Sequence, residues 1–179
     1  GKLKQQFLNS GTYRVLLGNQ DYAESLTTAE WLRDSMNKAR AIDLSVIATG
    51  YFKAMEQLLF ALIRLRTPSF NENSNLGNYA HYYKDHLNQL MRKDVDNATK
   101  CYVREAIFKY KDLRNGYLHK HNIHDPLKIC EIRSATYLLM YLVLGCHELS
   151  HTDLISLGLP DEVSKNGFQK LCEYIYFHR

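Results

Sequence analysis

Apolar residues recur every three or four positions along most of this chain, the spacing that places them on one face of an α-helix. The longest such pattern predicts a helix from Asp43 to Arg66. Thr67-Pro68 ends it, because the residue before a proline avoids the helical conformation. Its apolar positions are Leu44, Ile47, Tyr51, Met55, Leu58, Leu62 and Leu65. No useful length of chain alternates apolar and polar residues, so we expect no β-sheet.

Similar patterns and end signals predict further helices on both sides. The capping box Thr27-Thr28-Ala29-Glu30 predicts a helix over 28–40. Asp96 or Asn97 is expected to cap another, and Asp125-Pro126 to begin one that runs to about Ser150. The other segments are at most one helix within 1–22, a loop over 69–78, a helix over 79–93, a turn over 157–160 and a last helix over 161–177. The chain should therefore be an all-α bundle of six to seven helices.

The overall composition is that of one folded domain. The chain has 179 residues, of which 45% are hydrophobic and 23% charged, enough to form one buried core. We expect a single domain over 1–179, with its core at about 43–150 and flanking helices at both ends. The chain begins with Gly1 and not with methionine, which suggests a domain cut from a longer protein.

The net charge bears on which partners the protein could bind, and the cysteine spacing bears on its cellular compartment. The net charge of +4 and the pI near 8.8 permit an RNA partner without requiring one. The four cysteines are widely spaced, as expected for reduced core thiols of a cytoplasmic protein. The most apolar run, Ala135 to Cys146, is too short to cross a bilayer and is expected to be a core helix. We therefore expect a cytoplasmic protein without a membrane partner.

The segment from Tyr110 to His121, Y-K-D-L-R-N-G-Y-L-H-K-H, carries the candidate chemistry. The fork of Arg114 can hold a phosphate, the amide of Asn115 can orient it, and the imidazole of His119 can exchange protons near neutral pH. Positions five apart on a helix lie about 140° apart around its axis. We therefore expect the last regular turn to carry Arg114, and the chain to loosen near Gly116 so that His119 turns toward the same space.

The residues R-N-G-Y-L-H at 114–119, preceded by an amphipathic helix, resemble the R-N-x-x-x-H signature of the HEPN superfamily. The surrounding helical pattern agrees from about Asp43 to Ser150. The resemblance implies an all-helical bundle that commonly pairs so that two motifs face each other. Many members are metal-independent endoribonucleases of toxin or antiviral systems. Others only bind nucleotides or assist a partner enzyme.

The resemblance gives each residue of the motif a role in RNA cleavage. His119 would be the general acid or base when a ribose 2′-hydroxyl attacks the neighbouring phosphate and leaves a 2′,3′-cyclic phosphate. Arg114 would stabilise the growing charge, and Asn115 would position the phosphate. Because one imidazole does not easily act as both base and acid, a homodimer with two motifs is expected. No metal or cofactor is expected.

Four residues around the motif are supporting candidates. Lys111, Tyr117 and Lys120 are candidates for RNA contact, although solvated lysines and a core tyrosine are the plainer interpretations. The resemblance also suggests an acidic residue on the packing helix near the arginine, so Glu56 would orient Arg114. The alternative is that Glu56 pairs on the surface with Lys53 one turn earlier.

Other functions remain open. The domain would alternatively be a non-catalytic module that binds nucleotides or proteins. An antitoxin or a fused regulatory domain is a further expected partner, but members modified by a nucleotidyltransferase antitoxin carry tyrosine where this chain has His121.

Two histidine patterns suggest metal chemistry. A remote alternative is a zinc hydrolase, since His147-Glu148-Leu149-Ser150-His151 has the form H-E-x-x-H. His119, His121 and His124 form a second, unspecific candidate for a metal.

Overall fold

The computed structural model describes residues 20–36, 41–118 and 121–178, and these form seven helices without a strand. The prediction of an all-α bundle is therefore confirmed. The helices are α3 (Asp21–Met36), α4 (Ser45–Arg66), α5 (Leu76–Leu90), α6 (Asn97–Leu118), α7 (Pro126–Cys146), α8 (His151–Ser156) and α9 (Glu162–Phe177). The expectation of at most one helix within 1–22 concerns mostly residues outside the described part of the chain.

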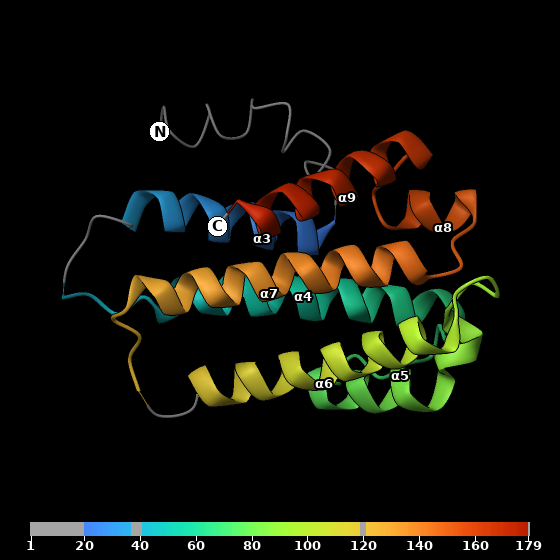
Figure 1. Ribbon diagram of the computed structural model, residues 1–179, viewed down its shortest axis with the longest axis horizontal. Coiled ribbons are helices and arrows are strands. Elements are labelled where there is room, and N and C mark those ends of the chain that lie inside the picture. Colours follow the sequence, from blue (N-terminus) through green and yellow to red (C-terminus); the bar gives the residue numbers. More distant parts are fainter. Residues whose placement is uncertain (1–19, 37–40, 119–120, 179) are drawn as a thin grey trace.

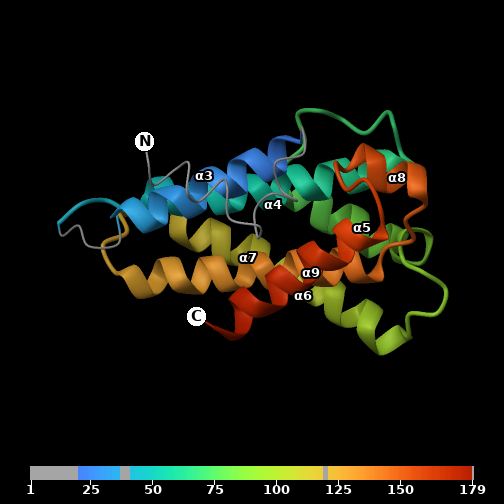
Figure 2. The same cartoon turned by 90° about the horizontal axis from the view of Figure 1, so that it is seen from above.

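Helix α4 lies at the centre of the bundle and contacts α3, α5, α6 and α7. It forms where the longest helical pattern predicts, and its inner positions from Ile47 to Ile63 are almost fully buried. Figure 1 shows α4 behind α7, with α3 and α9 along one side and α5 and α6 along the other. The view from above confirms that α7 and α9 lie on the face opposite α3 (Figure 2). Residues of α3 and α9 belong to the same hydrophobic core as those of α4.

The predicted start of the first described helix is wrong. Helix α3 spans Asp21–Met36 and begins seven residues before the predicted start at 28, so Thr27 and Glu30 lie within it and cannot cap it; the predicted end at 40 lies outside the described residues. Both are buried. The hydroxyl of Thr27 donates to the carbonyl of Ala23, and Glu30 pairs with Arg133. Thr27 and Glu30, which the capping pattern placed at the start of the helix, are therefore buried residues within it.

Two other helix boundaries differ from prediction for a shared reason. Helix α5 begins at Leu76, three residues early, because Asn75 and Asn78 cap each other's backbone amides. Helix α7 ends at Cys146, whose carbonyl accepts the backbone N–H of Arg92. In both cases polar contacts outside the apolar pattern determine where the helix begins or ends.

Other end signals are confirmed. Ahead of α6, Asp96 accepts the N–H of Thr99 at 2.6 Å. Ahead of α7, Asp125 accepts the N–H of Leu127 at 2.9 Å. Gly158 has a positive φ of 76°, as the predicted turn over 157–160 requires.

Two helices, α4 and α7, are long and apolar enough to cross a membrane by length and composition alone. In both, more than half of the most apolar window is buried inside the protein. Core helices of soluble proteins pass the same test, so the finding is weak evidence for a membrane span.

Candidate functional site

The motif helix α6 continues without a break from Asn97 to Leu118. The expected loosening after Arg114 is therefore wrong, and Asn115, Gly116 and Tyr117 are all helical. A helical glycine costs about 1 kcal/mol relative to alanine. Here the packing of Tyr117 and Leu118 against the core favours continuing the helix.

Helix α4 presents a carboxylate to the motif arginine. The Nε atom of Arg114 lies 2.8 Å from Oε1 of Glu56, and the two side chains are 34% and 24% exposed. The structure thus brings together the two residues that the family resemblance suggested, instead of pairing Glu56 with Lys53. The contact is an ion pair without hydrogen-bond geometry, because no N–H is directed at Oε1 of Glu56, and part of the Arg114 side chain still reaches solvent.

The Glu56 carboxylate lies in a partly dry environment. Burial raises its pKa above the ordinary value, and the neighbouring Arg114 guanidinium opposes this by lowering it. The negative charge of Glu56 also adds to the effect of burial in raising the pKa of Tyr79. Tyr110, whose hydroxyl is hydrogen-bonded to Thr136 at 2.8 Å, is buried nearby.

Asn115 lies beside the arginine on the same helix. The Nη1 group of Arg114 donates to the side-chain oxygen of Asn115 at 3.5 Å, a long hydrogen bond. Lys111 lies one turn earlier, with its ammonium 5.2 Å from the centre of the Phe108 ring. Arg114, Asn115 and Lys111 therefore place two cations and an amide on the last turns of α6.

Tyr117 contacts a different helix from Arg114. Its hydroxyl donates to Oε2 of Glu131 on α7 at 2.6 Å, and the ammonium of Lys128 lies 5.6 Å from its ring centre. Burial and the hydrogen bond to Glu131 raise the pKa of the phenol. Tyr117 thus occupies the α7 side of the motif helix.

His119 and Lys120 lie outside the described residues, so the position of the motif imidazole is not defined. The chain that follows is anchored to the start of α4. The N–H of Ile123 donates to Asp43 at 3.0 Å, and the N–H of Leu44 donates to the carbonyl of Ile123 at 2.7 Å. The sequence analysis missed this role of Asp43, although an aspartate two residues before Ser45 is a recognisable helix-start signal.

The zinc hydrolase interpretation is contradicted by the position of His147. Helix α7 ends one residue earlier, so His147 and His151 do not share a helix. The Nε2 atom of His147 is hydrogen-bonded to the hydroxyl of Tyr83 at 2.7 Å, and the ring is buried, whereas His151 is exposed. Burial lowers the pKa of His147 to about 3. Its imidazole therefore joins α5 to the end of α7.

Within the described ranges no three histidine, cysteine, aspartate or glutamate side chains are placed to hold a metal ion. His121 and His124 are exposed there, and a ring nitrogen of His124 lies 3.2 Å from the carbonyl of Ile42. The third member of that cluster, His119, lies outside the described part.

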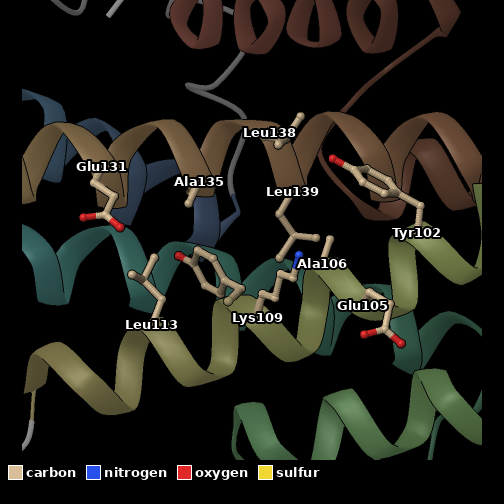
Figure 3. A pocket seen from close by; sticks show the side chains of 10 residues that line it. Tyr102, Glu105, Ala106, Lys109, Leu113, Glu131, Ala135, Leu138 and Leu139 are labelled. Carbon is tan, nitrogen blue, oxygen red and sulfur yellow. The ribbon is translucent and has the colours of Figure 1, made fainter.

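A groove of about 300 Å³ runs between α6 and α7 next to the motif (Figure 3). Its walls are mostly apolar, with Leu113 and Leu139 directed into the space between the helices. Lys109 on α6 and Glu131 on α7 are among its charged residues. The sequence analysis missed this groove because it depends on how the two helices cross.

Comparison with known proteins leaves the chain without an assigned relative. No protein-family model matches it, and neither a curated protein nor a solved structure does. A proposal for its function therefore starts from the motif, the helical order around it and the geometry at Arg114.

Proposed function

We propose that this protein is a metal-independent endoribonuclease of the HEPN type, acting in a toxin or antiviral system of the cytoplasm. The observation that carries the proposal is the ion pair between Arg114 and Glu56. It places a carboxylate beside the motif arginine near the end of α6, and 34% of the arginine side chain is exposed to solvent. A phosphodiester is a fitting ligand for a guanidinium fork, because its oxygens accept two parallel hydrogen bonds.

The proposed reaction is an attack by a ribose 2′-hydroxyl on its neighbouring phosphate. His119 removes or returns the proton, the bond to the 5′-oxygen breaks, and the products carry a 2′,3′-cyclic phosphate and a 5′-hydroxyl. Proton transfer by a positioned group contributes roughly 10²-fold to 10⁴-fold. Arg114 stabilises the charge on the phosphate, a contribution of about 3 kcal/mol for a well-aimed donor. Asn115, beside Arg114, positions the phosphate.

RNA is the proposed substrate, with Lys111, Tyr117 and Lys120 as its contacts near the motif. A homodimer supplies the second imidazole that acid and base catalysis on one phosphate requires. An antitoxin or a fused regulatory domain is the proposed control on the activity.

A non-catalytic binding module is the second candidate. The contact between Arg114 and Asn115 favours it, since an amide and a guanidinium together bind a phosphate without any proton transfer. RNA binding without cleavage would favour this alternative.

The first prediction tests cleavage in EDTA with the parent, His119→Ala, Arg114→Ala and the control Lys53→Ala on the exposed side of α4. We expect the parent and Lys53→Ala to cut RNA and leave 2′,3′-cyclic ends, and the two motif variants to lose at least about 10²-fold in rate. Gel electrophoresis and end-group analysis measure this. Equal cutting by all four proteins would refute the site, and loss of cutting in EDTA would refute a metal-independent reaction.

A further inference from the structure

A polar hollow of about 360 Å³ lies between the loop after α4 and the first turns of α5. Pockets that bind small molecules have volumes of about 300–1,000 Å³, so the hollow is large enough for one planar ring system. The polar side chains that line it include those of Asn73, Asn78, His81, Asp85 and His86. Amides, imidazoles and a carboxylate together offer donors and acceptors, so the hollow suits a ligand with a hydrogen-bonding edge.

Three of these polar side chains are not used by the fold. Asn73, His81 and Asp85 are exposed, and none of them forms a side-chain hydrogen bond or an ion pair with another described residue. Asn78, by contrast, caps the start of α5 together with Asn75, through hydrogen bonds of 2.9 and 3.1 Å. The hollow therefore combines a wall fixed by a helix cap with polar groups that can bind a ligand.

Aromatic rings form another part of the lining. The rings of Tyr82 and His86 are stacked, with their centres 4.1 Å apart and their planes inclined by 19°. The Nδ1 atom of His86 lies 3.0 Å from the carbonyl of Tyr82, and its Nε2 atom has no hydrogen bond within the described ranges. Phe70 meets Tyr82 edge-on at 5.2 Å. Unpaired bases of single-stranded RNA stack on rings of this kind, while polar side chains bind their edges.

The hollow adjoins the motif helix through His81, since α5 packs beside α6 (Figure 1). The His81 ring meets the Phe108 ring of α6 edge-on at 5.6 Å, and the Lys111 ammonium lies 5.2 Å from the same Phe108 ring. Phe108, Lys111 and Asn115 recur at helical spacing, so they follow one face of α6. The helical rise puts Phe108 about 10 Å from Asn115 along the axis. Stacked nucleotides are spaced by about 3.4 Å, so about three of them cover this distance.

A second set of contacts joins the same hollow to the carboxylate beside Arg114. Burial raises the pKa of Tyr79, and the nearby negative charge of Glu56 raises it further. The hydroxyl of Tyr79 donates to the carbonyl of Ser74 at 3.0 Å, and Ser74 lines the hollow. Tyr79 therefore connects the Arg114–Glu56 pair to the wall of the hollow.

We propose that this hollow, which we call the α5 pocket, binds one unpaired base of the RNA substrate, within about three nucleotides of the phosphate at Arg114. The base stacks on the Tyr82–His86 pair, and its edge is hydrogen-bonded to Asn73 and Asp85. The pocket thereby selects where the strand is cut. The inference rests on the proposed function for the identity of the ligand.

Asp85 determines which base the α5 pocket prefers. An ionised carboxylate accepts two hydrogen bonds side by side and donates none. Among the bases of RNA, only guanine has two neighbouring donors on its pairing edge, the N1–H and the N2 amino group. We therefore expect guanine in the pocket. In Asp85→Asn the side chain keeps its shape but offers one donor and one acceptor, so it no longer matches that edge.

The experiment maps the cut sites in RNA of random sequence, in EDTA, for the parent, Asp85→Asn, Asn73→Ala and the control Gln89→Ala. Gln89 is an exposed amide of α5 that does not line the hollow. We expect the parent and the control to favour guanine at least about tenfold at one position within about three nucleotides of the cut. The two pocket variants should lose most of this preference and still cut. Circular dichroism checks that they keep their helices.

A binding assay tests the α5 pocket without cleavage. Fluorescence anisotropy compares a labelled RNA pentanucleotide that has one guanine among adenines with the all-adenine pentanucleotide, using His119→Ala with and without Asp85→Asn. We expect His119→Ala to bind the guanine probe at least about tenfold more tightly, and the double variant to bind both probes about equally.

The two assays separate the pocket from the reaction. A parent that does not cut, together with a guanine preference in binding that depends on Asp85, would refute the ribonuclease and leave the pocket standing. Cutting without a base preference, or with a preference that Asp85→Asn leaves unchanged, would overturn the pocket and leave the ribonuclease standing. Absence of a guanine preference in both assays would also overturn the pocket.

Discussion

At the scale of single residues, the contact between Arg114 and Glu56 is the main feature that the structure adds to the motif. The carboxylate lies 2.8 Å from the guanidinium and is partly removed from water, so it limits the directions in which Arg114 can point. Burial raises the pKa of Glu56 and Arg114 lowers it, with burial the larger effect, so the fold disfavours the ionised carboxylate.

Glu56→Gln separates an effect of the carboxylate on the position of Arg114 from its effect on the stability of the fold. The amide keeps the shape but removes the charge, so we expect the cleavage rate to fall about tenfold to a hundredfold, as when a supporting group is lost. The free energy of unfolding should change by less than about 1 kcal/mol, because the ionised side chain is costly to bury. Single-turnover cleavage and urea unfolding measure the two quantities.

The matched control is Glu24→Gln, which neutralises an exposed glutamate on α3. It should leave the cleavage rate and the stability unchanged. A Glu56→Gln protein that cuts at the parent rate would show that the carboxylate does not position Arg114.

At the scale of helices, a buried ion pair joins α3 to α7. Two nitrogens of Arg133 lie 2.7 and 3.0 Å from the two carboxylate oxygens of Glu30, and the hydroxyl of Tyr51 on α4 donates to the same carboxylate at 2.9 Å. Glu30 is 1% exposed. Burial lowers the pKa of Arg133, but Glu30, Tyr51 and Tyr137 together raise it by more, so the guanidinium stays charged.

Glu30→Ala should therefore destabilise the protein by about 3–5 kcal/mol, because it leaves the Arg133 charge buried without a partner. The double variant Glu30→Leu with Arg133→Met should cost less than the single one. Urea unfolding at pH 7 measures both. The surface control is Asp94→Ala, whose pair with Arg92 is exposed and should contribute less than about 1 kcal/mol.

A double variant that is less stable than Glu30→Ala would contradict this account of the pair. So would a single variant no more destabilised than the surface control. In either case the contact would matter through packing and not through its charges.

At the scale of the whole molecule, the free energy of unfolding should depend on pH through His147, which is hydrogen-bonded to Tyr83 of α5 at the end of α7. His147 is buried, and burial lowers its pKa from the ordinary 6.5 to about 3. Between pH 6.5 and pH 3 the His147 imidazole is protonated in the unfolded chain but stays neutral in the folded protein. Stability is therefore fully present above pH 6.5 and is lost progressively as the pH falls toward 3.

The expected loss approaches about 1.4 kcal/mol per pH unit below pH 6. Urea unfolding between pH 7 and pH 4.5 measures this slope, and this range lies above the ordinary pKa of aspartate, so carboxylates contribute less to it. In His147→Gln the slope should be much smaller, although the protein will be less stable at pH 7. An unchanged slope in the variant would show that His147 is not the group responsible.

The apolar pattern by itself determined the class of fold and the place of α4. Helical periodicity over Asp43 to Arg66 needs only local spacing, and Thr67-Pro68 ends the helix through local sterics. Asp96 and Asp125 cap their helices for the same reason, since a cap contacts amides only two or three residues away. The residues of the motif were likewise recognisable from sequence alone.

Only the tertiary structure decided which of these signals were used. Thr27 and Glu30 formed a plausible cap, but Arg133, which lies 103 residues beyond Glu30 in the chain, draws that glutamate into the core. The H-E-x-x-H pattern does not form a zinc site, because the imidazole of His147 is hydrogen-bonded to Tyr83 and helix α7 ends at Cys146. The pairing of Glu56 with Arg114 and the α6–α7 groove also depend on how helices cross, which local spacing does not determine.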